Sequence, residues 1–383
     1  MKLEPLPLSA RIDDYVGQAR MLLAAHGAGE EWAIELLHQH HPRFLDPVVP
    51  WLPQRIDASV IRDAALDPDD ARLTVARGYS FRNWAALEAL VAEMANRDSP
   101  AREFEIAAEA VITGNRPDLE AMLRANPDLV RARSTRLTCH DPPAHRATLL
   151  HYLGANGIEG YRQRSPGNAV EIARVLLEAG AEVDALAGMY GGEYPTLSML
   201  VSSSPPADAG VQGPLAETLL DFGAAIEGCG SPQWKSPLLT ALVFGFLDTA
   251  ETLVRRGARV GDLVTAAGLG RLGEATRLLD AAGPAARHRA LALAAQLGHT
   301  DVVRLLLEAG EDPDRYNPDG FHAHATPLHQ AALAGREPVV RLLVERGARL
   351  DLKDALWQAT PLGWAQHAGQ AEVERYLSAR GAP

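Results

Sequence analysis

The sequence predicts an all-α protein, an α-solenoid of stacked helix pairs that follows a small helical domain. Three observations predict this fold. A Leu four residues before a Gly recurs along the chain, an Ala-rich run ending in Gly precedes several of these pairs, and the first hundred residues contain no repeat. Units that recur at such intervals bury their apolar faces against their neighbours, as in solenoids. We expect an N-terminal helical domain at 1–100 and a repeat domain at 101–383, with the boundary near 96–101.

The N-terminal domain is expected to be helical but aperiodic. Apolar spacing predicts helices at 9–26, 30–40, 59–65, 68–78 and 80–94. Pro42, Pro47, Pro50 and Pro53 interrupt the middle of this segment. Since proline breaks helices, we expect an extended stretch there.

The first repeated feature is a Leu-rich helix closed by glycine. A Gly in the left-handed conformation commonly ends a helix, and a Leu four residues earlier belongs to the buried face. The glycines with this pattern are Gly180, Gly223, Gly257, Gly283, Gly310, Gly347 and Gly381.

The second repeated feature is a short Ala-rich helix ending in Gly298, Gly335 or Gly369, with earlier copies ending at Gly114, Gly157, Gly245 and Gly270. The unit is therefore helix, Gly turn, helix, Gly cap and loop, and about eight units fit between 103 and 383. Three units are irregular. The second has an insertion at 158–168, the third has a loop at 202–206, and the fifth leaves almost no room for a finger.

One segment carries a family signature. Thr326-Pro327-Leu328-His329-Gln330-Ala331 matches the ankyrin pattern T-P-L-H-x-A in full, and a related Thr360-Pro361-Leu362 begins 34 residues later. Thr suits the N-cap of a helix and Pro its first position. Residues 101–383 thus resemble ankyrin repeats, and the resemblance implies protein binding through the concave face and the fingers.

The N-terminal domain also contains a recognisable motif. The segment 71–84 resembles the A-x-x-x-A-R-x-Y-G-F-x-S-W stretch that precedes the repeats of many bacterial ankyrin proteins, although Ser80 replaces the usual Gly and Asn83 the usual Ser. We interpret Tyr79, Phe81 and Trp84 as members of a small helical core, with a binding patch as the alternative.

Composition excludes several classes of protein. The net charge of −12 argues against a nucleic-acid partner, because phosphate binding requires a basic face. No apolar stretch is long enough for a membrane helix, so no membrane partner is expected. The two cysteines, Cys139 and Cys229, are interpreted as reduced thiols of a cytoplasmic protein. We expect a monomer without a cofactor.

Two clusters of reactive residue types are interpreted as structural. His38, His40 and His41 lie at a helix end, where neighbouring side chains diverge by about 100° and do not easily share a metal. Cys139-His140-Asp141 combines a nucleophile, a base and an acid, but adjacent residues in a loop seldom converge as catalysis requires. No catalytic residue and no metal ligand is assigned.

The C-terminal fingers depart most from the family pattern. The long finger at 312–325 contains four extra residues, and the next finger has a Trp near the tip where a Gly is usual. Tyr, Trp and Arg are enriched at binding hot spots. The predicted partner-binding residues are Arg315, Tyr316, Phe321, His322, His324, Trp357, Gln358 and Trp364.

Alternatives remain for these fingers. Trp357 either packs on Trp364 or on the longer finger beside it, or it anchors a partner. Aromatic residues also lie in earlier fingers, at Tyr190, Tyr194 and Trp234. If 321–325 is an extended strand, His322 and His324 point to one face and can meet a metal.

The predicted function is that of a protein–protein interaction scaffold or adaptor rather than an enzyme. The first alternative is a ligand- or metal-sensing ankyrin protein that uses the finger at 312–325. The second alternative is an enzyme with its site in the N-terminal domain, where no nucleophile motif, phosphate loop or carboxylate pair supports it.

Overall fold

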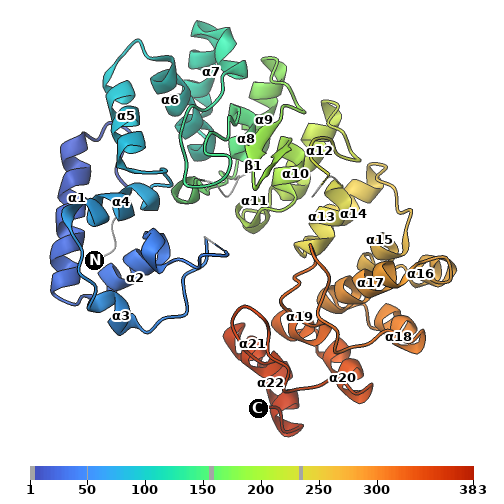
Figure 1. Ribbon diagram of the computed structural model, residues 1–383. Coiled ribbons are helices and arrows are strands. Elements are labelled where there is room, and N and C mark those ends of the chain that lie inside the picture. Colours follow the sequence, from blue (N-terminus) through green and yellow to red (C-terminus); the bar gives the residue numbers. More distant parts are fainter. Residues whose placement is uncertain (1–4, 50, 155–158, 233–235) are drawn as a thin grey trace. The chain divides into compact units, whose positions relative to one another are not determined.

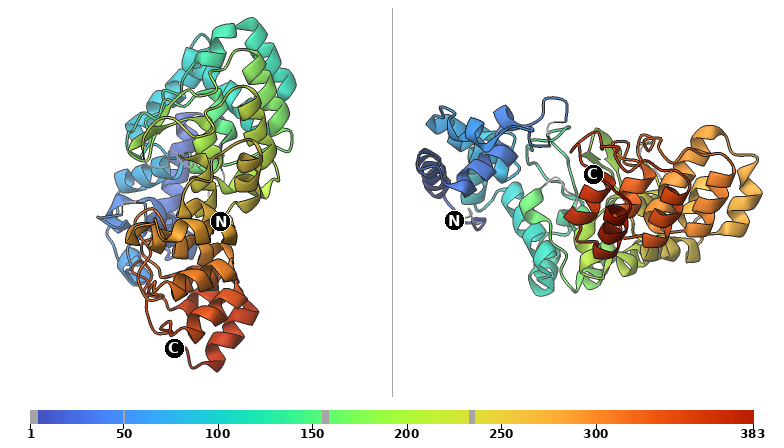
Figure 2. Two further views of the ribbon diagram at one scale, coloured as in Figure 1. Left: turned by 90° about the vertical axis from the view of Figure 1, so that its right-hand side faces the viewer. Right: turned by 90° about the horizontal axis from the view of Figure 1, so that it is seen from below.

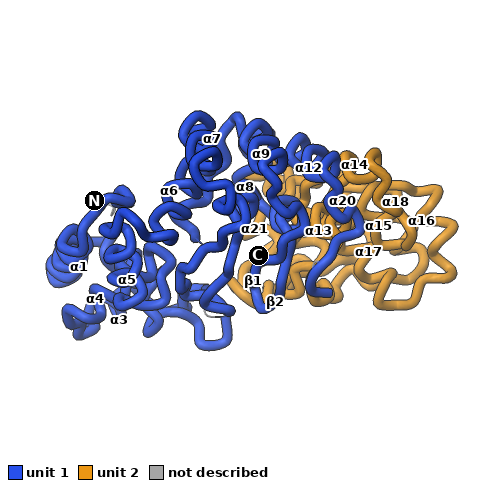
Figure 3. The backbone as a smooth tube through the Cα atoms, turned by 90° about the horizontal axis from the view of Figure 1, so that it is seen from above, with its two compact units in different colours: residues 1–235 blue, residues 236–383 orange. Residues whose placement is uncertain are grey.

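The computed structural model describes residues 5–49, 51–154, 159–232 and 236–383, and it is mostly helical (Figure 1). Helix pairs follow a helical N-terminal segment, which confirms the predicted fold class. The chain divides into two compact units, residues 1–235 and residues 236–383 (Figure 3). This division falls within the repeats, and the predicted domain boundary near 96–101 stays a prediction.

The described residues of the N-terminal segment form five α-helices and one 3-10 turn. Their order is α1 Ile12–Gly27, α2 Glu31–His40, η1 Pro42–Phe44, α3 Ala58–Arg62, α4 Pro68–Gly78 and α5 Trp84–Ala95. The helix expected at 80–94 begins later because Asn83 caps it, accepting a hydrogen bond from the backbone N–H of Ala86 at 3.0 Å.

The aromatic residues of the N-terminal motif form part of a core, as the first interpretation held. Tyr79 and Phe81 are buried, and Trp84 packs against the same cluster. Ser80 between them has a left-handed backbone with φ of 64°. Glycine adopts this conformation most easily, so the structure explains why glycine is usual there.

The repeats in residues 1–235 are irregular. Their elements are α6 Pro100–Thr113, α7 Arg116–Ala125, η2 Pro127–Arg131, α8 Leu149–Leu153, η3 Gly160–Arg162, α9 Ala169–Glu178, β1 Ala187–Met189, β2 Gly192–Tyr194, α10 Thr196–Leu200, α11 Ser204–Asp208 and α12 Gln212–Asp221. The two strands pair antiparallel as a hairpin finger. The expected loop at 202–206 is wrong in part, because its prolines begin the short helix α11. Gly157, Ile158 and Trp234 lie outside the described residues.

The repeats in residues 236–383 are regular. Their helices are α13 Pro237–Val243, α14 Leu247–Arg255, α15 Leu263–Gly268, α16 Leu272–Leu279, α17 Pro284–Leu297, α18 Thr300–Glu308, α19 Pro327–Leu333, α20 Glu337–Glu345, α21 Pro361–His367 and α22 Ala371–Ala379. With the pairs that begin at α6, α8 and α10, the described residues contain eight helix pairs. Figure 2 shows the helices of this unit lying side by side.

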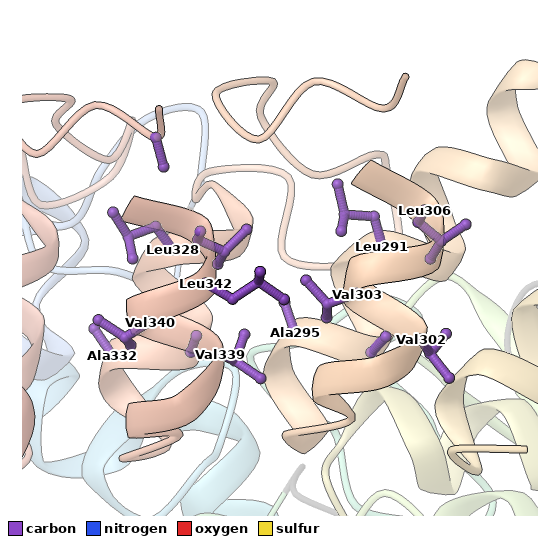
Figure 4. Close-up of a cluster of buried hydrophobic side chains, with 14 of the residues drawn as sticks. Leu291, Ala295, Val302, Val303, Leu306, Leu328, Ala332, Val339, Val340 and Leu342 are labelled. Atoms are coloured by element: carbon purple, nitrogen blue, oxygen red, sulfur yellow. The ribbon is translucent and has the colours of Figure 1, made fainter. Parts of the chain in front are cut away.

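The core of this second unit is aliphatic. Leu291 of α17, Val303 and Leu306 of α18, Leu328 of α19 and Val340 of α20 meet between successive pairs (Figure 4). Alanine residues such as Ala295 and Ala332 are fully buried between them, and their small size allows the helices to approach closely.

Six of the seven predicted Gly caps have a left-handed φ, between 77° at Gly381 and 106° at Gly257. The prediction for Gly283 is wrong. Its φ is −70°, and it is the N-cap of α17 rather than the end of α16. The following Pro284 occupies the first turn of that helix, so the chain passes from one repeat to the next without a finger.

Among the described residues, no helix combines the length and the apolar character that spanning a membrane requires. Neither Cys139 nor Cys229 forms a disulfide bond within the part of the chain that the structure describes.

Candidate functional site

The two C-terminal fingers lie side by side, as their consecutive positions predict. The long finger is closed by the backbone N–H of Asn317, which donates to the carbonyl of Ala325 at 2.8 Å. The next finger joins it through the N–H of Ala355, which donates to the carbonyl of His324 at 2.7 Å. The hydroxyl of Tyr316 also donates to the carbonyl of Lys353. The altered fingers therefore form one connected surface.

A helix of the preceding repeat supports the long finger. His288 of α17 is buried, and its Nε2 donates to the carbonyl of Tyr316 at 2.7 Å. The guanidinium of the next residue, Arg289, lies 5.8 Å from the ring centre of Phe321. Both residues lie in the first half of α17, which begins at Pro284 and is longer than the other first helices of residues 236–383.

Asp354 fixes the tip of the second finger. Its carboxylate is fully buried and accepts hydrogen bonds from the backbone N–H groups of Leu356, Trp357 and Ala359 and from Nε1 of Trp364. Burial alone disfavours the charge, but these donors outweigh it and hold the pKa of Asp354 below its usual range. Sequence reasoning missed this residue, since one carboxylate in a loop has no pattern that separates it from a solvated one.

An aromatic cluster lies over this loop. The ring centres of Trp357 and Trp364 are 5.8 Å apart, and that of His324 lies 5.0 Å from Trp357 and 5.7 Å from Trp364. The ring centre of His329, in the signature motif, lies 5.3 Å from that of Trp364. The first alternative for Trp357, packing on Trp364 and on the long finger, is therefore observed, and its role as an anchor stays a prediction.

Packing does not cover Trp357. Its side chain remains 55% exposed and that of Tyr316 39% exposed, and Arg315 and Gln358 are exposed as well. With the half-buried His324, these residues form a surface that we call the finger patch: Arg315, Tyr316, His324, Trp357 and Gln358.

Three predicted site residues do not belong to this surface. Phe321 and Trp364 are buried, at 7% and 6% exposure. Phe321 packs under the long finger beside Arg289, and the indole N–H of Trp364 points to Asp354. His322 binds the carbonyl of Val243 through Nε2 at 3.1 Å. Phe321 and Trp364 are therefore part of the packed base of the fingers, and the half-buried His322 is held by its hydrogen bond to the carbonyl of Val243.

The proposed extended strand at 321–325 is not present. His322 has a left-handed φ of 62° and the following residues form a turn, so the two-residue alternation of a strand does not apply. The rings of His322 and His324 lie 6.1 Å apart and nearly perpendicular. Within the described residues, no group of three or more His, Cys, Asp or Glu side chains could hold a metal ion.

Burial also affects the charge of these histidines. Desolvation lowers the pKa of His324, and the neighbouring His322 lowers it further. Desolvation likewise lowers the pKa of His329, although its bond to the carbonyl of Ala359 opposes the shift. Neutral imidazoles therefore face the tryptophans at neutral pH.

The other reactive clusters have structural partners. His38 Nε2 donates to the carbonyl of Gln54 at 2.7 Å, and His41 lies 3.2 Å from the carboxylate of Asp70. Burial raises the pKa of the Cys139 thiol, which disfavours the thiolate that a nucleophile requires.

The earlier fingers do not repeat the finger patch in the described residues. Tyr190 at the turn of the β1–β2 hairpin is 51% exposed, whereas Tyr194 is buried at 2%. Both residues belong to one hairpin, so this finger carries one exposed aromatic residue, and Trp234 lies outside the described residues.

Comparison with known proteins identifies the repeats. The family model described as "Ankyrin repeats (3 copies)" matches residues 263–354 and 291–382. Cyclin-dependent kinase inhibitor 2A of Homo sapiens is 35% identical over 121 residues, which are 30% of this chain and 75% of that protein. Cyclin-dependent kinase 4 inhibitor B of Rattus norvegicus is 34% identical over 127 residues, covering 32% of this chain and 95% of that protein.

A longer match is weaker. The protein mask-1 of Caenorhabditis elegans, an ankyrin repeat and KH domain-containing protein, is 26% identical over 226 residues, 57% of this chain but 8% of its own length. The chain belongs to the ankyrin-repeat proteins, with matched repeats in its C-terminal part. These relatives come from animals and do not support the expectation of a bacterial protein.

Proposed function

We propose that this chain is a protein–protein interaction scaffold or adaptor, acting by binding rather than by catalysis. Its ankyrin fingers and first helices bind a protein partner, and the finger patch is the hot spot. The single observation that carries the proposal is the exposure of Trp357 on a rigid loop tip, where 55% of a large apolar side chain faces solvent.

The rigidity of that loop supports a binding role. Asp354 accepts three backbone hydrogen bonds within the loop, and Gln358 adds a bond from its side chain to the carbonyl of Asp354 at 3.1 Å. Fixing Trp357 before the partner arrives removes an ordering cost of about 0.5–1.5 kcal/mol for such a side chain. A preorganised aromatic residue is a typical hot-spot anchor.

The chemistry around Trp357 suits a partner surface with both apolar and acidic or carbonyl groups. Trp357 and Tyr316 offer ring faces, Arg315 offers a guanidinium, and Gln358 offers an amide at the same edge. Two of the similar proteins are named as inhibitors of cyclin-dependent kinases, and their likeness to this chain supports a protein partner here. We place this interaction in the cytoplasm and expect the chain to act as a monomer.

Site-specific photo-crosslinking tests the proposal. A benzophenone amino acid at Gln358 should yield one dominant covalent adduct in lysate of the source cells. The same group at Leu272, an exposed residue of α16, is the matched control and should not yield that adduct. Equal adducts from both positions, or none from Gln358, would contradict a hot spot at the finger patch.

A further inference from the structure

A cavity lies inside residues 1–235, between the N-terminal helices and the first two repeats. Its volume is about 350 Å³, within the range of small-molecule sites. Most of its wall is apolar and comes from Leu6, Tyr15, Phe81, Leu90 and Ile112, while Arg136 and Arg162 lie on one side.

Two carboxylates hold these arginines. Glu105 accepts hydrogen bonds from Arg136 Nε and Nη2 at 3.0 and 2.8 Å, and lies 2.8 Å from Arg162 Nη1. Glu159 accepts from His145 at 2.9 Å, from the Tyr152 hydroxyl at 2.7 Å and from Arg162 Nη1 at 3.2 Å. Every carboxylate oxygen in this buried cluster therefore has a donor.

Several N–H groups of the two arginines, in contrast, have no acceptor within the described part of the chain. Arg136 Nη1 and Arg162 Nε and Nη2 are buried and have no hydrogen-bond partner among the described residues. Both side chains are 2% exposed, and arginine stays protonated, so these N–H groups require acceptors. The carboxylate nearest to Arg162 Nη2 is Glu109 at 3.8 Å, beyond hydrogen-bond distance.

Aromatic rings do not replace those acceptors. The guanidinium of Arg136 lies 4.9 Å from the ring centre of Phe81 and 5.6 Å from that of Tyr161, and Arg162 lies 5.8 Å from the latter. Ring faces are weak acceptors. They do, however, give the arginine side of the cavity an apolar rim.

We propose that this cavity binds a small organic carboxylate with an apolar body. A carboxylate presents two oxygens to a guanidinium fork, which matches donors left free on adjacent arginines. The apolar wall then covers the body of the ligand. Because Glu105 and Glu159 already balance the two arginines, a monoanion fits better than a dianionic phosphate, which Glu109 would also repel.

The experiment uses the full chain with phenylacetate, hexanoate, neutral phenylacetamide and inorganic phosphate, each at about 10 mM. Phenylacetate or hexanoate should raise the thermal midpoint by at least about 2 °C in a saturable manner, while phenylacetamide and phosphate should not. No shift with either carboxylate, or an equal shift with phenylacetamide or phosphate, overturns the proposal.

Two variants locate the binding. Val91→Trp places a large side chain from α5 in the cavity while both arginines are kept, and it should abolish the shift, whereas Val48→Trp, at a residue 85% exposed, should preserve it. If Val91→Trp does not fold, Arg162→Lys keeps a cation beside both glutamates but removes the free fork, and should weaken phenylacetate binding at least about tenfold. Unchanged binding in the folded variant places the ligand elsewhere and overturns the proposal.

Discussion

Residues 1–235 and residues 236–383 are both built from paired helices, but the side chains that they bury differ in polarity. The second unit packs Leu, Val and Ala between successive pairs. The first also buries two carboxylates and two guanidinium groups, from Glu105 and Arg136 and from Glu159 and Arg162. The buried carboxylate of the second unit, Asp354, is held by N–H donors of its own loop and of Trp364 rather than by a buried cation. In the first unit, the inserted segment at 158–168 contributes Glu159 and Arg162, whose buried charges require partners of opposite sign.

A substitution of a buried side chain should therefore lower the stability of the two units for different reasons. In an aliphatic core, a lost contact leaves a cavity of the size of the removed atoms. In a buried ion cluster, a lost partner leaves an uncompensated charge. Substitutions in each unit test this difference.

The largest effect is expected at Arg136. Arg136→Met should lower the free energy of unfolding by about 3–5 kcal/mol, because Glu105 would lose its main partner in a buried site. Urea denaturation measures the change. The control is Arg375→Met, whose ion pair with Glu372 is exposed and should matter by less than about 0.5 kcal/mol. Similar losses in both variants would refute the distinction.

Leu306 tests the aliphatic core. It is fully buried in α18, and Leu306→Ala should cost about 2–5 kcal/mol in the same assay. Leu272→Ala, at a residue 41% exposed, is the matched control and should change stability by no more than about 0.5 kcal/mol. A loss below about 0.5 kcal/mol at Leu306 would mean that its helix face is wrongly assigned.

The signature histidine occurs in both units and gives a pH-dependent test. In each, Nδ1 accepts from a Thr N–H, 3.2 Å for His151 and 3.3 Å for His329, and Nε2 donates to a carbonyl of the next finger. Burial lowers the pKa of His151 to about 4, so the neutral form is the native one.

As the pH falls, the unfolded chain protonates this histidine at a higher pH than the folded chain does. The contribution of neutral His151 to stability is therefore fully present above the ordinary histidine pKa of about 6.5 and is lost as the pH decreases toward about 4. The loss at His151 should reach about 3 kcal/mol by pH 4. Denaturation midpoints from pH 7.5 to 4 measure it, and His151→Gln should flatten the curve. An equally steep curve in that variant would exclude His151 as the cause.

The smallest effect concerns Ser80, where the N-terminal motif departs from its usual glycine. Ser80→Gly relieves a left-handed backbone but loses the bond from Gly160 N–H to the hydroxyl at 3.1 Å, so the net change should stay within about 1 kcal/mol. Ser80→Ala keeps the strain and loses the bond, and should be the less stable variant by about 1 kcal/mol. The opposite order in denaturation would contradict this account.

The sequence predicts the regular unit well because its information is local. The motif at 326–331 sets the N-cap, the first-turn proline and the buried face of α19, and the Gly caps recur in register. Gly283 was misassigned because the Leu–Gly spacing is identical whether the glycine ends one helix or begins the next.

The sites could be predicted less well, for a physical reason. Exposure of a finger residue depends on contacts from distant segments, such as Val243 with His322 or Arg289 with Phe321. The buried ion cluster joins residues 31 positions apart at Glu105 and Arg136, and no periodicity relates them. Sequence patterns therefore located the altered fingers but could not separate the exposed Trp357 from the buried Trp364.

The most direct test of the central claim is Trp357→Ala with two measurements on the same preparation. If the finger patch binds the partner, the thermal midpoint should change by less than about 2 °C, since the side chain is 55% exposed, while partner captured from lysate should fall at least about tenfold. If instead the midpoint falls strongly and partner capture is unchanged, the exposed tryptophan is structural and the proposed binding site is wrong.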